Sequence, residues 1–314
     1  MKKITALLLV LFVLVGALAG CGKQNDTNKT DKLSIVTTIF PEYDWVREIL
    51  GDKADNAEIT MLLDNGVDLH SYQPTADDIV KISDCDLFIY VGGESDGWVE
   101  DALRNAANRN MKVINLLEIL GDAHAHDDAE EHEHEEEADE HVWLSLKNAK
   151  MLVRVISKAL QELDPDNKDI YAANADAYVK KLSALDADYQ AAVDAASNKT
   201  ILFGDRFPFR YLVDDYGLRY YAAFVGCSAE TEAGFETISF LAKRVDEWKL
   251  PCVLTIEGAQ HKIAETIVRN TTTKNQKVLT MDSMQSTTTQ DVKNGTTYLS
   301  VMEKNLSVLK EALR

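Results

Sequence analysis

The sequence predicts an α/β protein of two lobes, each with a mainly parallel sheet flanked by helices, joined by one long rigid helix. In both halves, short runs rich in Val, Ile and Thr alternate with helical segments at a spacing typical of parallel βαβ units. One helical pattern over residues 166–197 separates the halves and contains neither Gly nor Pro. The chain of 314 residues is long enough for two such lobes.

The first 32 residues are expected to lie outside this fold. Lys2 and Lys3 precede an apolar stretch over 6–19 that is too short for a stable membrane span, which predicts a signal peptide over residues 1–20. The sequence Leu-Ala-Gly-Cys that ends at Cys21 resembles a bacterial lipobox, in which the cysteine is lipidated. Residues 21–32 then form a lipidated tether, and the protein is held outside the cell on the bacterial membrane. The alternative is an ordinary signal peptide followed by a chance cysteine.

The N-terminal lobe is expected to cover residues 33–165. Pro41 suits the first turn of a helix that Gly51 ends, and Thr75 suits the N-cap of a later helix. Strands are expected at 33–38, 59–63, 86–91 and 112–115, and helices at 41–50, 75–83, 95–108 and 146–163.

A composition break interrupts this lobe at residues 121–140. The segment holds eleven acidic residues, four histidines and no Lys or Arg. Because it has almost no apolar side chains, it cannot bury a core of its own, and we expect a mobile loop.

The linker helix is expected over 166–197, with apolar and aromatic side chains along one stripe that must pack on both lobes. The C-terminal lobe, 198–314, repeats the earlier pattern. Its strands are expected at 200–203, 219–222, 252–256 and 277–280, and its helices at 207–215, 232–249, 261–270 and 288–313.

Charge and cysteine content narrow the classes of function. A formal charge of -19 argues against a nucleic-acid partner. Beyond Cys21 the chain has three cysteines, an odd number that does not suggest a disulfide framework. Cys85 and Cys252 border apolar runs and are expected to be core thiols. Cys227 is the third cysteine.

Four polar side chains follow predicted strands or lead into a helix, where ligands bind in open parallel sheets. His70 lies on a short loop before the Thr75 cap, and His141 precedes the helix at 146. Asp205 and Asp282 follow two strands of the second half. Two imidazoles and two carboxylates suit a divalent transition ion held between the lobes. A single Asp after a strand is usually a helix cap, so the hypothesis depends on all four meeting at one place.

Several motifs also resemble the metal-binding solute-binding lipoproteins of bacterial ABC importers, which carry zinc or manganese. The similar segments are T-T-I-F-P at 37–41, D-L-H-S-Y-Q-P-T at 68–75, E-H-V-W-L-S-L-K-N-A at 140–149, M-D-S at 281–283 and Y-L-S-V-M-E-K-N-L at 298–306. The resemblance covers nearly the whole mature chain. It implies two α/β lobes bridged by a rigid helix, capture of a divalent metal ion in the cleft, and delivery to the importer's permease.

The resemblance assigns His70 and His141 to the first two metal ligands and Asp282 to a fourth. Where the family usually has a His or Glu as third ligand, this chain has Arg206, a cation that cannot bind a metal ion. Asp205 is then the expected substitute, with Arg206 pointing away toward Asp214 or Asp215. The alternative is Glu257, either as a ligand or as an acceptor for an imidazole N–H.

The histidines of the acidic loop form two His-x-His pairs, and zinc-type members of the family often carry such a loop. It is expected to hold divalent ions loosely; its histidines are His124, His126, His132 and His134. The imidazoles and this loop favour zinc as the cargo, although two histidines with two carboxylates also suit manganese.

Two other classes of function remain open from the sequence. A zinc hydrolase would need a motif such as H-E-x-x-H, and His132-Glu-His-Glu-Glu136 fails at its last position. A surface adhesin is the third class, because lipoproteins of this family are sometimes linked to attachment. The main expectation is a monomeric binding protein, with no catalytic residues, that binds zinc, the bilayer through Cys21 and an ABC permease.

Overall fold

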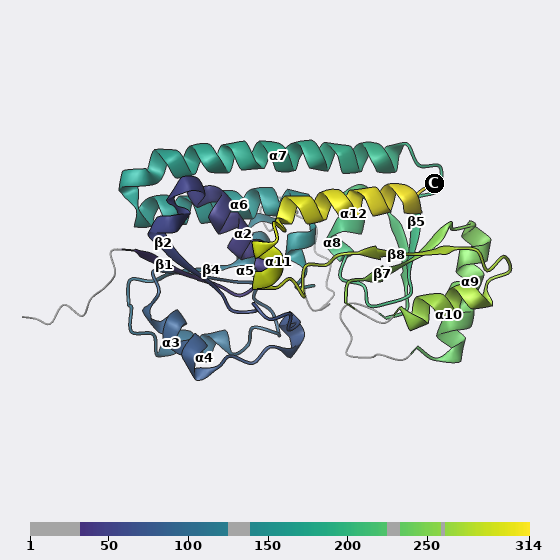
Figure 1. Ribbon diagram of the computed structural model, residues 1–314, viewed down its shortest axis with the longest axis horizontal. Coiled ribbons are helices and arrows are strands. Elements are labelled where there is room, and N and C mark those ends of the chain that lie inside the picture. Colours follow the sequence, from purple (N-terminus) through teal and green to yellow (C-terminus); the bar gives the residue numbers. More distant parts are fainter. Residues whose placement is uncertain (1–31, 125–138, 225–232, 259–260) are drawn as a thin grey trace, which may run out of the picture. The chain divides into compact units, whose positions relative to one another are not determined.

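The computed structural model describes residues 32–124, 139–224, 233–258 and 261–314, and it confirms the predicted fold class (Figure 1). The predicted signal peptide and most of the tether, residues 1–31, lie outside the described residues. No helix in the described ranges is long and apolar enough to cross a membrane.

The N-terminal sheet contains four parallel strands in the order β2-β1-β3-β4. They are β1 (Leu33–Thr37), β2 (Ala57–Met61), β3 (Leu87–Tyr90) and β4 (Lys112–Asn115). Its helices include α2 (Phe40–Leu50), α3 (Ala76–Asp84), α4 (Val99–Arg104), α5 (Leu116–His124) and α6 (Leu146–Leu163). Figure 1 shows α2 and α3 on opposite sides of this sheet, as a doubly covered parallel sheet requires.

The C-terminal sheet repeats the same connectivity in the order β6-β5-β7-β8, again all parallel. Its strands are β5 (Thr200–Phe203), β6 (Arg219–Ala222), β7 (Cys252–Ile256) and β8 (Lys277–Met281). Its helices are α8 (Arg210–Tyr216), α9 (Phe235–Trp248), α10 (Lys262–Asn270), α11 (Thr289–Lys293) and α12 (Tyr298–Ala312). In each sheet the first strand of the lobe lies between its second and third, so ligand-binding loops are expected beside that strand in both lobes.

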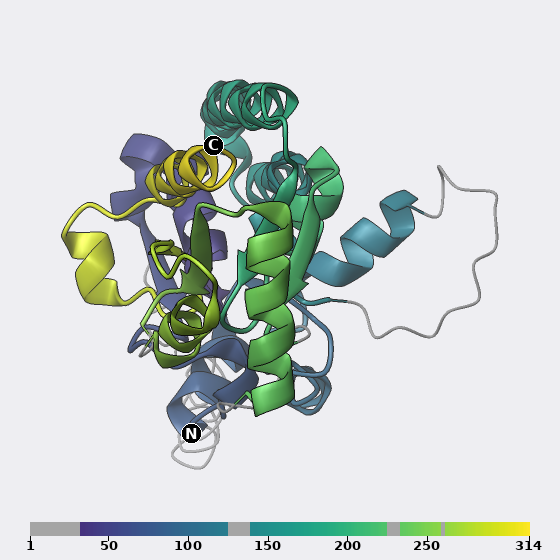
Figure 2. The ribbon, with the colours of Figure 1, turned by 90° about the vertical axis from the view of Figure 1, so that its right-hand side faces the viewer.

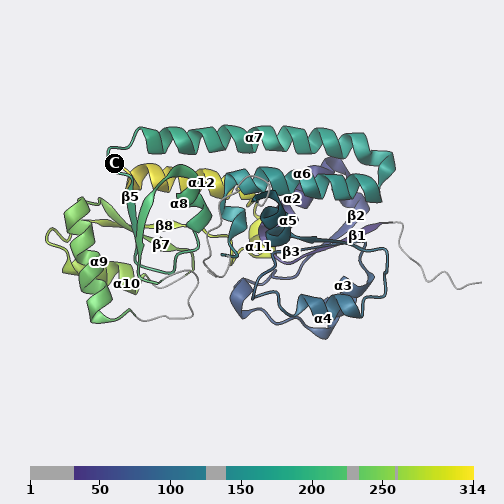
Figure 3. The same cartoon turned by 180° about the vertical axis from the view of Figure 1, so that it is seen from behind.

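The long helix α7 (Lys168–Asp194) joins the lobes and follows a short 3-10 turn, η4 (Pro165–Asn167). It packs on α2 and α6 of the N-terminal lobe and on α8 and α12 of the C-terminal lobe. Figures 2 and 3 show α7 beside α12 from the end and from behind. The stripe predicted for this helix runs from Ile170 to Tyr189. It is buried at Tyr171, Tyr178, Leu182 and Tyr189, whereas Ile170 is 41% exposed.

One continuous set of buried side chains contains residues of both sheets, for example Ile35 and Phe203, together with the stripe of α7. A smaller second cluster lies among β5, β7, α9 and α10. Cys85 and Cys252 are buried free thiols, as expected, and Cys227 lies outside the described residues.

Two helix predictions need correction, and one helix was not predicted. The helix predicted at 95–108 is reduced to Val99–Arg104, after turns that begin near Ser95. The helix predicted at 288–313 is split into α11 and α12, because the backbone turns at Gly295 with φ of 96°. The acidic loop is preceded by a helix that reaches His124; Asn115 caps it by accepting from the backbone N–H of Glu118 at 3.1 Å.

Candidate metal site between the lobes

His70 is presented by the short 3-10 turn η2 (Leu69–Ser71), which follows β2. Asp68 is the N-cap of this turn, and its Oδ1 accepts the backbone N–H of His70 at 3.0 Å. Leu69 is buried beneath the turn, and the His70 side chain is 25% exposed. The turn therefore fixes the backbone of His70 while its ring remains accessible.

His141 lies just before the 3-10 turn η3 (Val142–Leu144), whose three side chains are all buried. Asp139 Oδ1 accepts the backbone N–H of His141 at 2.9 Å and lies 2.7 Å from its Nδ1. Because a carboxylate only accepts, Nδ1 of His141 carries a proton. The His141 side chain is only 3% exposed, so its ring has little freedom to rotate.

The two imidazoles meet, as the sequence predicted. Nε2 of His70 lies 3.3 Å from Nε2 of His141, and the ring centroids are 5.3 Å apart. The two Nε2 nitrogens therefore point toward the same small space.

Glu140 contacts the His70 ring at Nδ1, on the side away from Nε2. Its Oε2 lies 3.3 Å from Nδ1 of His70 and accepts the Ser95 hydroxyl at 2.5 Å, and its Oε1 accepts the Ser95 N–H at 2.8 Å. Since Ser95 Oγ donates to Glu140, it accepts from Nδ1 of His70 at 2.8 Å. Both histidines therefore direct Nδ1 to a carboxylate system and leave the Nε2 lone pair facing the other ring.

The loop after β3 makes room for Glu140. Gly93 has φ of 82°, and a Cβ on it would lie 2.4 Å from Glu140 Oε1. A side chain at this position would therefore displace the carboxylate that contacts His70.

Asp205, the expected third ligand, makes backbone hydrogen bonds. Its Oδ1 accepts the Arg206 N–H at 2.9 Å, and its Oδ2 accepts the N–H of Ile256 at 3.4 Å. Arg206 does not point toward Asp214 or Asp215. Its Nη1 lies 3.1 Å from Asp68 Oδ2 in the other lobe. The prediction for Arg206 was wrong, because Asp214 pairs with Arg210 and Asp215 pairs with Lys147.

Asp282 lies close enough to Glu257 to affect the ionisation of Glu257. Burial raises the pKa of both carboxyls, and the charge of Asp282 adds to the rise at Glu257. Asp282 Oδ1 accepts the Met284 N–H at 2.8 Å, and Glu257 accepts the N–H and hydroxyl of Ser283 at 2.7 and 2.6 Å. Glu257 thus shapes the turn after β8.

The predicted set of four ligands is brought together only in part. Across the described ranges, no three histidine, cysteine or acidic side chains converge closely enough to hold one ion. His70 and His141 form a pair, whereas Asp205 and Asp282 bind neighbouring backbone amides. Their assignment as ligands stays a prediction.

One polar side chain at this site was missed by the sequence analysis. Gln285 is 5% exposed, and one orientation of its amide directs the nitrogen toward Asp68. Its nitrogen then donates to Asp68 Oδ1 and Oδ2 at 3.0 and 3.1 Å, and its oxygen lies 3.2 Å from His141 Nε2. Its position only four residues after β8 was the available signal.

The predicted auxiliary loop is described only at its start. His124 is the last residue of α5, whereas His126, His132 and His134 lie outside the described residues. The role of these four histidines in loose metal binding stays a prediction.

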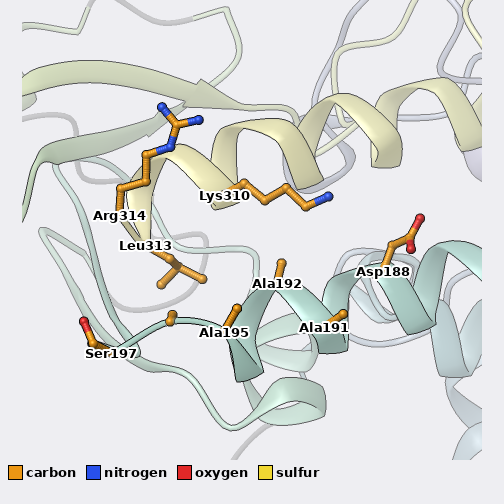
Figure 4. A pocket seen from close by; sticks show the side chains of 9 residues that line it. Asp188, Ala191, Ala192, Ala195, Ser197, Lys310, Leu313 and Arg314 are labelled. Atoms are coloured by element: carbon orange, nitrogen blue, oxygen red, sulfur yellow. The ribbon is translucent and has the colours of Figure 1, made fainter.

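Two cavities elsewhere in the described part of the chain are lined by residues other than the predicted ligands. One of about 540 Å³ lies between the C-terminal ends of α7 and α12; Figure 4 shows its alanine-rich wall and the basic side chains Lys310 and Arg314. A second, of about 230 Å³, is lined by Tyr43, Met61 and Val292 among others.

Comparisons of this chain with a family model and with known proteins agree on one family. Residues 35–312 match the family model described as zinc-uptake complex component A, periplasmic. The zinc-binding lipoprotein AdcA of Streptococcus pneumoniae serotype 4 is 34% identical over 318 residues, which cover 99% of this chain and 61% of AdcA. The high-affinity zinc uptake system protein ZnuA of Bacillus subtilis is 31% identical over 316 residues, which cover 96% of this chain and 97% of ZnuA.

Solved structures agree with the fold. The Zn(II)-bound ZnuA-like domain of Streptococcus pneumoniae AdcA matches with a TM-score of 0.72 and 31% identity, covering 90% of this chain and 99% of that domain. The metal-dependent lipoprotein YcdH of Bacillus subtilis matches with a TM-score of 0.73 and 27% identity, covering 90% of this chain and 99% of that one. This chain spans 61% of the length of full AdcA.

Proposed function

The chain belongs to the family of zinc-uptake complex component A, periplasmic, and from this we propose that it captures a zinc ion outside the cell and delivers it to an ABC importer. Members of this family are components of an uptake complex, so the proposed zinc ion is transported cargo. The observation that carries the proposal is the pair of imidazoles with Nε2 atoms 3.3 Å apart, each held from behind by a carboxylate system.

The chemistry of this pair favours a cation. With Nδ1 protonated on both rings, each Nε2 lone pair faces the other ring, an arrangement that a positive ion between them stabilises. Imidazole nitrogen is a preferred ligand of zinc, and sites of this kind bind zinc more tightly than manganese. His70 and His141 are therefore the proposed core of the site. Asp282 and Asp205 are the proposed further ligands, and Glu257 is the alternative.

The proposed setting is a monomeric lipoprotein anchored through lipidated Cys21. The names of the relatives, which include a zinc-binding lipoprotein, support this placement. A permease that receives the ion is the proposed partner, since the family is one component of an uptake complex.

The test is a competition assay on the mature chain, residues 21–314, against a chromophoric zinc chelator. We expect one tightly bound zinc per chain, and we expect an excess of manganese not to displace it. Equal or tighter binding of manganese would support the manganese alternative. The absence of any stoichiometric binding would contradict the proposal.

A further inference from the structure

The two lobes are tied together beside His70 by the carboxylate of Asp68. Its Oδ1 accepts the His70 N–H at 3.0 Å, and its Oδ2 lies 3.1 Å from Arg206 Nη1 in the C-terminal lobe. The Asp68 side chain is 18% exposed and that of Arg206 is 30% exposed. A partly buried, charge-assisted hydrogen bond of this kind is stronger than an ion pair on an open surface.

Hydrogen bonds of Asp205 hold the backbone of Arg206 in place. The Arg206 N–H donates to Asp205 Oδ1 at 2.9 Å, and the other oxygen of Asp205 accepts the N–H of Ile256 at the end of β7. The next residues, Phe207 and Phe209, are buried. The guanidinium therefore extends from a segment that the C-terminal sheet holds in place.

Gln285 reaches Asp68 from a second segment of the same lobe. Its amide nitrogen donates to both oxygens of Asp68, and its backbone N–H donates to Glu257 Oε1 at 3.2 Å. The amide oxygen lies 3.2 Å from His141 Nε2 and 3.2 Å from the hydroxyl oxygen of Ser283. One side chain thus contacts the cap of the His70 turn and the His141 ring.

From these contacts we infer that Arg206 is a positioning residue for the metal site. Together with Gln285 it holds Asp68, and through the Asp68 cap it sets the place of His70 relative to His141. The role of the turn in metal binding rests on the proposed function, whereas the link between the lobes rests on the contacts alone. Arg206 thus links the C-terminal lobe to the His70 turn by an ion pair.

The charge of Arg206 alone would act in the opposite direction. A guanidinium near the site repels a divalent cation, so its removal would tighten zinc binding if repulsion were its main effect. Positioning predicts weaker binding after removal, because the His70 turn must then be ordered when the ion binds. The two accounts therefore differ in the sign of one measurement.

The experiment compares Arg206→Met with Arg210→Met in the mature chain. Arg210 is a nearby control, since it pairs with Asp214 within α8. Hydrogen exchange of the His70, Ser71 and Tyr72 amides is measured in metal-free protein, and zinc affinity is measured by chelator competition. Arg206→Met should speed this exchange and weaken zinc binding about tenfold, with Arg206→Lys intermediate and Arg210→Met like the parent.

A second substitution separates the ion pair from general damage to the fold. Asp68→Asn keeps an acceptor for the His70 N–H but removes the charge and one acceptor of the Gln285 amide. In the Arg206→Met background it should therefore cost less affinity than it does in the parent. Exchange in Arg206→Met equal to that in Arg210→Met, full additivity of the two substitutions, or tighter zinc binding would each overturn the inference. If the parent binds no zinc, the proposed function fails, yet the exchange rates still decide whether the link exists.

Discussion

At the scale of single residues, two consecutive acids serve two different histidines. Asp139 contacts His141, and Glu140 contacts His70, which is distant in sequence. Burial alone would raise the pKa of Glu140, but hydrogen bonds from His70 and Ser95 hold it below its usual range. The carboxylate thus stays ionised, and its charge increases the basicity of the His70 nitrogen that faces the metal ion.

Glu140→Gln tests this arrangement. The amide keeps the size of the side chain but removes the charge, so we expect zinc affinity to fall about 10–100-fold with little change in stability. Glu118→Gln, on the exposed side of α5, is the matched control. Nitrogen-15 NMR of the His70 ring should show a changed tautomer balance in Glu140→Gln. An unaltered ring spectrum together with parental affinity would count against the role of Glu140.

A second residue-scale prediction concerns pH and stability. Asp44 is 4% exposed, and burial raises its pKa from about 3.8 to about 7, although the Tyr298 N–H donates to it. Because the folded pKa is raised, the stabilisation by this proton is fully present below about pH 4 and is lost as the pH rises to about 7. Asp44→Asn should therefore gain melting temperature relative to the parent at pH 8 but not at pH 4.

The control for that comparison is Asp52→Asn on an exposed turn, which should shift the melting temperature equally little at both values. Thermal unfolding monitored by circular dichroism gives the measurement. A parallel change of Asp44→Asn at pH 4 and pH 8 would refute the assignment.

At the scale of elements, alternating strands and helices predicted both sheets and the joining helix to within a few residues at their ends. The period of apolar side chains and the capping residues are local signals, which is why they could be read from the sequence. The break at Gly295 and the helix over Leu116–His124 were missed for different reasons. The break at Gly295 was missed because the sequence around it is polar and rich in Thr. The helix over Leu116–His124 was missed because it adjoins the acidic stretch, although Asn115 followed by Glu118 is a recognisable cap.

The site was less predictable than the fold. His70 and His141 follow from their positions beside turns, but the partner of Arg206 does not, because an ion pair between lobes depends on their relative position and leaves no local pattern. The same holds for Gln285, whose neighbours Asp68 and His141 are more than a hundred residues away in sequence. The backbone hydrogen bonds of Asp205 also leave no local pattern, because a carboxylate that accepts amides and one that binds a metal ion look the same in sequence.

The acidic, histidine-rich segment gives the element-scale prediction. Replacing His126, His132 and His134 by Asn should leave the tight zinc site and the melting temperature unchanged, because the proposed tight ligands lie elsewhere in the chain. The number of weakly bound zinc ions, measured by equilibrium dialysis, should fall. Loss of the tight ion in this variant would show that the segment belongs to the main site.

At the scale of the whole molecule, α7 and the shared core hold the lobes by direct contacts. Trp143 donates to the Ser283 carbonyl at 2.8 Å, and Tyr298 donates to the Trp143 carbonyl at 2.6 Å. These buried bonds connect the segment after His141 with the C-terminal lobe, which favours small adjustments near the site over a wide opening of the lobes.

Membrane attachment is the prediction for the full-length protein. Cys21→Ala should release the protein into the medium, because stable anchoring requires the acyl chains that a lipidated cysteine carries. Cell fractionation followed by immunoblotting provides the measurement. Unchanged retention in the membrane fraction would show that another part of the chain anchors the protein.

The most direct test of the central claim is zinc X-ray absorption spectroscopy of the mature chain loaded with one equivalent of zinc. Imidazole rings give a distinct outer-shell scattering pattern, so the ligands can be identified without relying on affinity. We predict a zinc ion coordinated by two imidazoles, with one imidazole lost in His141→Ala and the other in His70→Ala. A spectrum without imidazole scattering, or one that neither substitution changes, would contradict the account.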